Sequence, residues 1–248
     1  TVAADDGWEL YDTTKDFSLS NNLAEKEPER LEAMKKKFME EAIENQVLPL
    51  DDRLLERLVP SVAGRPTLLG DRTSIDLYPY AWNMVEDSIL NVKNVSNSVT
   101  AFVDSKGGEE DGVIFSQGGR FGGWSLYVEK NRPSYTYNYM GELVTLTSNK
   151  PLPAGKSEIR FELDYDGGGT GKGADLRLKL NGEVVAEGRM EKTIASRFSI
   201  DEGADVGLDR GSAVTIKTIG PRRYSAYGGQ IDKVTLQIYP KDTDAKQG

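Results

Sequence analysis

The sequence predicts a mainly β protein, a β-sandwich or β-barrel of many short strands that follows a segment with one strand and one helix. From about residue 73 onward, short runs rich in β-branched and aromatic residues follow one another, and Gly, Asn, Asp or Pro bounds each run. A helical pattern of convincing length occurs only before residue 58. A series of about ten short strands with turn signals between them is typical of a sandwich or a barrel.

The first 58 residues are expected to form a short strand and one amphipathic helix. The strand candidate is the stretch WELYD, residues 8–12. The helix is expected to begin at Pro28, because a missing N–H costs nothing in the first turn, and to end near Asn45. Residues spaced three and four apart give this helix one apolar stripe, formed by Leu31, Met34, Phe38 and Ala42.

A connecting segment is expected between this helix and the strand-rich part. The pattern weakens between residues 51 and 73, where Pro60, Gly64 and Pro66 argue against a regular element. The sequence therefore predicts four parts, namely residues 1–58, a linker over residues 59–72, a β-sandwich over residues 73–240 and a flexible tail over residues 241–248.

The strand candidates after the linker show clear turn and face signals. They are VTAFV, GVIFS, WSLYVE, PSYTYNY, LVTLTS, SEIRFELDY, ADLRLKL, VVAEGRM, AVTIKTI and KVTLQIY. Asn181 and Gly182 tolerate positive φ and predict a two-residue type I′ turn, hence a hairpin between two candidates. Alternation in SEIRFELDY places four residues on one buried face, Ile159, Phe161, Leu163 and Tyr165.

The composition excludes several classes of function. With 31 Lys and Arg against 40 Asp and Glu, the formal net charge is −9, so a nucleic-acid partner is not expected. The chain has no Cys and no His, which removes thiolate nucleophiles, Cys-based zinc sites and Ser-His-Asp catalysis. No apolar run is long enough for a membrane span, and no signal-peptide pattern opens the chain, whose Thr1 suggests a processed or truncated protein.

The first segment resembles a known protein family. The stretch GWELYDTTKDFSLSNNLAEKEPERLEAMKKKFMEEAIENQVLPLDDR, residues 7–53, looks like the carboxy-terminal end of bacterial-type arylsulfatases. The segments GGRFGGWSLYV, YDGGGTGKG, LNGEVVAEGR and FSIDEGADVG resemble the all-β extension that follows this end in a subset of arylsulfatases. The resemblance implies that residues 1–58 are the remnant of a sulfatase subdomain. It also implies a jelly-roll sandwich of the concanavalin A/laminin G type over residues 73–240.

The chemistry that this resemblance implies lies upstream of the chain. Arylsulfatases hydrolyse sulfate esters with a formylglycine, formed in a Cys/Ser-x-Pro-x-Arg motif, and with a Ca²⁺ or Mg²⁺ ion. The chain lacks Cys, His and that motif, so it is expected to be non-catalytic and to hold no cofactor of its own. The implied partners are an upstream catalytic sulfatase domain and a sulfated glycan. The implied location is the periplasm or the exterior of a bacterium.

An aromatic-rich stretch is a candidate carbohydrate site. Aromatic rings offer flat faces to sugar rings, and a nearby Arg can meet a sulfate or a carboxylate. The candidates are Arg120, Trp124, Tyr135, Tyr137 and Tyr139. The alternative interpretation is that these rings fill the interior of the sandwich, with tyrosine hydroxyls at its rim.

Two acidic stretches have both a functional and a structural interpretation. Asp201, Glu202 and Asp205 are weak candidates for a structural Ca²⁺ site, because Ca²⁺ takes several carboxylate and carbonyl oxygens. An acidic turn is the ordinary interpretation of that stretch. Glu162 and Asp164 share one face of a strand candidate, as paired carboxylates of a glycoside hydrolase would. A solvated strand face is the alternative.

The leading interpretation is the non-catalytic carboxy-terminal region of an arylsulfatase, with a sandwich that packs on the catalytic domain or contacts a substrate glycan. Two alternatives stay open. One is a free-standing, lectin-like carbohydrate-binding module, and the other is a jelly-roll glycoside hydrolase that uses Glu162 and Asp164. The apolar stripe of the helix is expected to find cover on the sandwich or on a second copy of the chain.

Overall fold

A computed structural model describes residues 7–48, 50, 68–108, 110–218 and 225–240 of the chain. The chain divides into two compact units, residues 1–64 and residues 65–248. The predicted tail, and the predicted linker up to residue 67, lie outside the described residues. Within the described ranges, no helix has the length and the apolar character that a membrane crossing needs.

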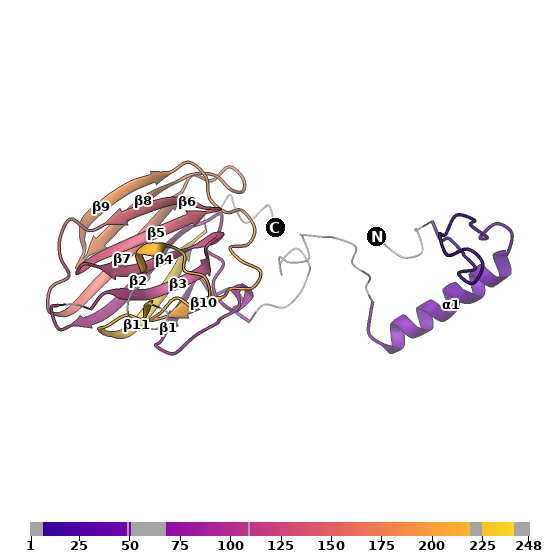
Figure 1. The fold of residues 1–248 in the computed structure, drawn as a ribbon, viewed down its shortest axis with the longest axis horizontal. Coiled ribbons are helices and arrows are strands. Elements are labelled where there is room, and N and C mark those ends of the chain that lie inside the picture. The colour runs from indigo at the N-terminus through magenta and orange to yellow at the C-terminus, as the bar shows by residue number, and fades with distance from the viewer. Residues whose placement is uncertain (1–6, 49, 51–67, 109, 219–224, 241–248) are drawn as a thin grey trace. The chain divides into compact units, whose positions relative to one another are not determined.

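The first unit contains one helix, α1 (Pro28–Glu44), which begins and ends where the sequence predicted (Figure 1). The strand predicted over residues 8–12 is wrong, because the backbone there bonds to a loop and not to another strand. The amide of Leu10 donates to Asn22 Oδ1 at 3.0 Å, and the carbonyl of Leu10 accepts from the amide of Leu23 at 2.7 Å. The segment before α1 is therefore a folded-back loop.

Part of the apolar stripe on α1 is covered within the first unit itself. Ala42 is buried, and the ring of Trp8 packs edge-on against Phe38 with the ring centroids 5.5 Å apart. Met34 and Ile43 keep more than half of their surface exposed. The loop before the helix thus supplies one cover that the sequence analysis did not anticipate.

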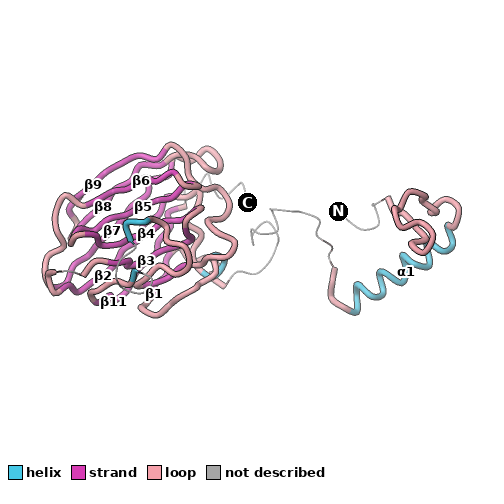
Figure 2. Tube along the Cα trace, viewed as in Figure 1, coloured by secondary structure: helices cyan, strands magenta, loops and turns pink. Residues whose placement is uncertain are grey.

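The second unit is a jelly-roll β-sandwich of two antiparallel sheets (Figures 1 and 2). The six-stranded sheet has the order β1-β11-β2-β7-β8-β9, and the five-stranded sheet has the order β10-β3-β4-β5-β6. The strands are β1 (Ser74–Leu77), β2 (Ser96–Ser105), β3 (Gly112–Gly119), β4 (Gly122–Glu129), β5 (Arg132–Tyr139), β6 (Glu142–Thr147), β7 (Gly155–Tyr165), β8 (Ala174–Leu180), β9 (Glu183–Met190), β10 (Ala204–Val206) and β11 (Gln230–Tyr239). Two short 3₁₀ helices complete the described elements, η2 (Glu86–Ser88) and η3 (Ile216–Thr218).

Local turn chemistry accounts for the β8–β9 hairpin, and the lack of a pairing partner accounts for one predicted strand that does not form. Asn181 and Gly182 have φ values of 51° and 84° and join β8 to β9, as the sequence predicted. The strand predicted in AVTIKTI, residues 213–219, is wrong over its described part, residues 213–218, because this part turns into η3 instead of pairing with a sheet. Its β-branched residues satisfy strand propensity, but propensity is a weak guide where no ladder partner is available.

The core lies between the two sheets and is joined by aromatic packing. Tyr135 of the five-stranded sheet stacks on Phe161 of the six-stranded sheet, with ring centroids 3.4 Å apart and ring planes 6° from parallel. Trp124 also stacks on Tyr135, with ring centroids 5.9 Å apart. The predicted inward face of β7 is confirmed, since Ile159, Phe161, Leu163 and Tyr165 are all buried.

The outer face of the five-stranded sheet is also buried, because the segment after β10 lies against it. Ser116 Oγ donates to the carbonyl of Leu208 at 3.1 Å. Asn138 Nδ2 donates to the carbonyls of Val214 and Arg120, each at 2.9 Å. These side chains hold the segment over residues 207–214 in place, and this segment borders the site described below.

Truncation of the cross-sheet stack should destabilise the sandwich strongly. We expect Phe161→Ala to lower the free energy of unfolding by about 3–5 kcal/mol, because the change leaves a cavity between two packed sheets. Urea unfolding followed by tryptophan fluorescence measures this loss. Lys156→Ala on the exposed part of the same strand is the matched control and should change stability by less than about 0.5 kcal/mol. Equal effects of the two variants would contradict the role given to the stack.

Candidate functional site

The aromatic residues predicted to bind sugar do not form a surface. Trp124, Tyr135 and Tyr137 have at most 3% of their surface exposed and lie in the core. Tyr139 is half-buried, with Lys192 Nζ 4.4 Å from its ring centroid. Only Arg120 is exposed. The placement of the three buried rings matches the alternative interpretation, in which they fill the interior of the sandwich.

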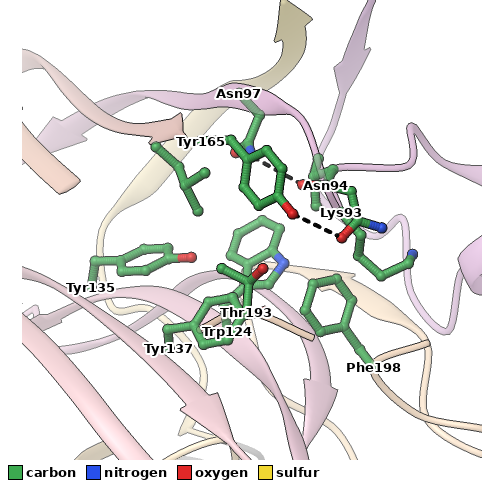
Figure 3. A pocket seen from close by; sticks show the side chains of 11 residues that line it. Lys93, Asn94, Asn97, Trp124, Tyr135, Tyr137, Tyr165, Thr193 and Phe198 are labelled. Carbon is green, nitrogen blue, oxygen red and sulfur yellow. Dashed lines mark hydrogen bonds between the residues drawn. The ribbon is translucent and has the colours of Figure 1, made fainter. Parts of the chain in front are cut away.

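A small interior cavity lies beside these rings (Figure 3). Its lining joins the rings to polar residues, and the labelled members are Lys93, Asn94, Asn97, Trp124, Tyr135, Tyr137, Tyr165, Thr193 and Phe198. The cavity volume is about 10 Å³, which is room for about one water molecule. A sugar ring cannot enter it.

The polar groups around this cavity hold loops together. Asn94 Nδ2 donates to the carbonyl of Ala195 at 2.7 Å, and Asn94 Oδ1 accepts from the amide of Gly171 at 2.8 Å. The hydroxyl of Tyr165 donates to the carbonyl of Gly169 at 2.6 Å and points toward Asn94 (Figure 3). Because these groups bond to backbone atoms of two loops, we interpret the network as structural.

A buried ion pair lies next to the same network. Lys93 Nζ donates to Glu86 Oε1, and both side chains are at least nine-tenths buried. Burial lowers the pKa of Lys93, and the charge of Glu86 opposes that shift. Glu86 Oε2 also accepts from the amide of Phe198 at 3.0 Å. The pair anchors the loop before β10 and is closed to ligands.

The carboxylates predicted for a glycoside hydrolase lie on the outer face of the six-stranded sheet. Burial favours the protonated form of Glu162, but hydrogen bonds from Lys179 and Arg160 outweigh it and hold the pKa of Glu162 below its ordinary value. The N–O distances are 2.8 Å to Arg160 Nε and 2.9 Å to Lys179 Nζ. A general acid needs a raised pKa, so the environment of Glu162 does not suit that role. Asp164 is exposed on the same strand.

An open polar pocket lies at the β10 edge of the five-stranded sheet. Its volume is about 220 Å³. Its lining is Asn83, Asp201, Glu202, Gly203, Asp205, Arg210 and Gly211. The three weak Ca²⁺ candidates therefore do come together. Among the described residues, however, no group of three or more Asp, Glu, His or Cys side chains has an arrangement that could hold a metal ion.

Backbone amides position the carboxylates of this pocket. Asp205 Oδ1 accepts from the amide of Asn83 at 2.6 Å, and Asp205 Oδ2 accepts from the amide of Arg210 at 3.0 Å. Glu202 Oε1 accepts from the amide and the hydroxyl of Ser212 at 3.2 and 2.6 Å. In the described part of the chain, Glu202 Oε2 is buried and has no hydrogen-bond partner. The pocket wall is therefore ordered by local hydrogen bonds.

The dense glycines of GGRFGG are explained by this wall. A Cβ at Gly119 would overlap the carboxylate of Glu202 and would lie 2.7 Å from the carbonyl oxygen of Ser212. The amide of the next residue, Arg120, donates to Ser212 Oγ at 3.1 Å. The turn between β3 and β4 can therefore approach the pocket wall only because position 119 has no side chain. Arg120 is the one predicted sugar-site residue whose backbone touches this region.

Two exposed aromatic residues next to this pocket were missed by the sequence analysis. Tyr80 is 80% exposed and Trp82 is 43% exposed, and their rings meet edge to face with centroids 5.6 Å apart. Tyr80 and Asn83 have φ values of 72° and 53°, which is a strained conformation for a bulky residue such as Tyr80. The available signal was the spacing of Tyr78, Tyr80 and Trp82 at every second position.

Backbone pairing places this aromatic pair beside the pocket. Trp82 Nε1 donates to the carbonyl of Val206 at 3.0 Å, and the amide of Val206 donates to the carbonyl of Ala81 at 3.0 Å. Asp205, which precedes Val206, binds the amide of Asn83, which follows Trp82. The two segments are thus joined by hydrogen bonds, and the residues next in sequence to Trp82 and Val206, namely Asn83 and Asp205, line the polar pocket.

A buried carboxyl group lies behind the pocket. Asp209 is 3% exposed, its Oδ2 accepts from the amide of Val214 at 3.0 Å, and its Oδ1 has no partner in the described structure. Burial raises the pKa of Asp209 to about 7, the hydrogen bond from Val214 opposes the shift, and the charges of Glu202 and Asp205 add to it.

Asp209 should make stability depend on pH. Its pKa is raised from 3.8 to about 7 in the folded state, so between pH about 4 and 7 only the unfolded chain loses the proton and the free energy of unfolding falls as pH rises. Asn cannot ionise, so Asp209→Asn should remove this decline and raise stability at pH 8 by about 1–4 kcal/mol. Urea unfolding at pH 4.5, 6 and 8 measures it, with the exposed Asp175→Asn as control. If the free energy of unfolding falls with pH as much in Asp209→Asn as in the wild type, Asp209 is not the group with the raised pKa.

Comparison with known proteins gives structural matches only. No protein-family model and no curated protein matches the chain. Similar solved structures include the CBM40 of the Ruminococcus gnavus IT-sialidase bound to α2,3 sialyllactose, with 11% identity, a TM-score of 0.43, and coverage of 69% of this chain and 94% of that chain. A mutant NanB sialidase from Streptococcus pneumoniae has 12% identity and a TM-score of 0.45, and the match covers 70% of this chain and 28% of NanB. Mouse laminin α1 LG4–5 has 10% identity and a TM-score of 0.39, with coverage of 71% and 42%.

The expected membership in the arylsulfatases is corrected by these findings. The similar structures named above and a leech trans-sialidase are sialidase carbohydrate-binding modules, sialidases and laminin domains, and none of these is a sulfatase. No family model and no curated protein supports a sulfatase carboxy-terminal region. An apolar stretch followed by a Pro-initiated helix is a common local feature, so the resemblance of residues 7–53 was a poor guide to family.

Proposed function

We propose that the β-sandwich is a lectin-like carbohydrate-binding module whose site is the exposed Tyr80–Trp82 pair and the polar pocket beside it. The single observation that carries the proposal is the position of Trp82, an exposed ring that is fixed by its hydrogen bond to Val206 and directly precedes Asn83, which lines a pocket with charged groups. Sugars present apolar ring faces and polar hydroxyl edges, and this site offers a partner for each.

The aromatic pair is suited to stacking because it is already ordered. The indole N–H of Trp82 is used by the carbonyl of Val206, so the ring does not have to be immobilised when a ligand arrives. Tyr80 packs against it at an interplanar angle of 67° and is held by a backbone conformation with positive φ. Strained backbone of this kind is concentrated at ligand sites in proteins.

The pocket is suited to the polar edge of one sugar residue. Its volume of about 220 Å³ lies below the roughly 300–1,000 Å³ of pockets that enclose a drug-sized ligand. Carboxylates accept hydrogen bonds from hydroxyl groups, and the guanidinium of Arg210 donates them. A terminal or branching sugar ring with its hydroxyls turned into the pocket would bond to the carboxylates and to the guanidinium.

The proposed role is binding without catalysis. Glu162 is held ionised by two cationic partners, which does not suit a general acid. Asp209 is the one carboxyl in the described structure whose pKa is clearly raised, and it is buried behind the pocket wall. A bound sugar in the open pocket would not reach its proton.

Loss of the exposed ring should abolish most of the affinity. We expect Trp82→Ala to weaken binding of the best oligosaccharide ligand by at least about tenfold, equivalent to about 1.4 kcal/mol. A glycan array identifies the ligand, and isothermal titration calorimetry of the full chain measures the change. The control is Phe17→Ala, which removes an exposed aromatic ring from the first unit and should leave the affinity unchanged.

Two results would contradict this function. One is the absence of binding to any oligosaccharide of a broad array. The other is an affinity for the best ligand that is the same in Trp82→Ala as in the wild type, with both variants folded by circular dichroism.

A further inference from the structure

The charge of the pocket bears on which sugars can bind there. Three carboxylates, those of Asp201, Glu202 and Asp205, line the pocket together with one guanidinium, that of Arg210. The lining therefore has a formal excess of negative charge, and the whole chain carries −9 as well. An anionic group that enters would meet like charges at short range, and such juxtapositions disfavour binding.

Among the described residues, the side chains bonded to these carboxylates are neutral. The first wall residue, Asp201, has an exposed carboxylate whose hydrogen-bond partner is the neutral hydroxyl of Ser199 at 2.8 Å. Glu202 is bonded to the neutral Ser212. In the part of the chain that the structure describes, no ion pair joins any of the three wall carboxylates to a Lys or an Arg. The hydrogen bonds that these carboxylates accept therefore come from backbone amides and hydroxyl groups, which carry no net charge.

A second observation shows that this negative field acts on neighbouring groups. Burial is the largest cause of the raised pKa of Asp209, and the negative charges of Glu202 and Asp205 raise it further. A carboxylate or a sulfate of a ligand would be subject to the same repulsion. A hydroxyl group would instead gain, because an ionised acceptor makes a stronger hydrogen bond than a neutral one.

We infer that the pocket takes a sugar ring without negative charge, which donates hydroxyl hydrogen bonds to the wall carboxylates, and that it rejects sialylated and sulfated glycans. This inference rests on the proposed carbohydrate-binding function and narrows it to one ligand class. Trp82 provides the stacking face, and the exposed carboxylate of Asp201 provides the acceptor at the polar edge. The guanidinium of Arg210 donates to a ring or hydroxyl oxygen.

The test compares neutral ligands with their charged derivatives. A glycan array of neutral, sialylated and sulfated oligosaccharides is probed with the full chain, and titration calorimetry follows on the best neutral ligand and its sialylated or sulfated derivative. We expect the charged derivative to bind at least about tenfold more weakly at low ionic strength. Raising the salt concentration should narrow this difference, because salt screens exposed charges and leaves neutral contacts unchanged.

A charge-neutralising variant makes the test specific to the pocket. Asp201→Asn keeps the size of the side chain and removes one negative charge from the pocket wall. It should therefore reduce the ratio of the affinities for the neutral and the charged ligand by about threefold. The matched control is Asp175→Asn, which removes an exposed carboxylate on β8 and should leave the difference unchanged.

The outcomes separate the inference from the function on which it rests. Equal or tighter binding of a sialylated or sulfated glycan, lost in Trp82→Ala, would overturn the inference and leave the carbohydrate-binding function standing. Absence of binding to every glycan, or binding that Trp82→Ala does not affect, would overturn the proposed function and the inference with it. Three results together support the inference and the proposed function. The wild type binds the neutral ligand more tightly than the charged one, Asp201→Asn reduces this difference in affinity, and Trp82→Ala loses the binding.

Discussion

The sandwich depends on aromatic packing between its two sheets. Backbone ladders hold each sheet together, but the described strands form two separate sheets, so the packing of side chains between them must hold the sheets face to face. Tyr135 and Phe161 stack across this gap at 3.4 Å, and Trp124 extends the stack within the five-stranded sheet. Burial of these rings removes a large apolar area from water and fixes how the sheets face each other.

The candidate site follows from this arrangement through the edge strand β10. Once the sheets are fixed, β10 pairs with β3 on one side and with the segment around Trp82 on the other. That second pairing aligns an exposed aromatic ring with carboxylates that extend from the loops around β10. The glycine at position 119 lets the β3–β4 turn approach closely and close the wall. The site is thus a consequence of how the sheet edge is covered.

Several features could be predicted from the sequence because their cause is local. The Asn181-Gly182 turn depends on two residues that tolerate positive φ, and the buried face of β7 depends on strict alternation. The roles of Trp124, Tyr135 and Tyr137 could not be predicted in this way. Both faces of the five-stranded sheet are buried, so alternation does not tell an inner ring from an accessible one. Trp82 was overlooked because its importance comes from Val206, which lies 124 positions later.

The sequence by itself determined the mainly β class, the helix that begins at Pro28, the absence of Cys and His, and the excess of acidic residues. Each of these depends on composition or on neighbours within a few residues. The tertiary structure alone decided which aromatic rings are buried and which are exposed, and which acidic residues share a pocket. Asn83 and Asp205 meet because two segments 122 positions apart in the chain pair at one sheet edge, and such a long-range contact leaves no periodic trace in the sequence.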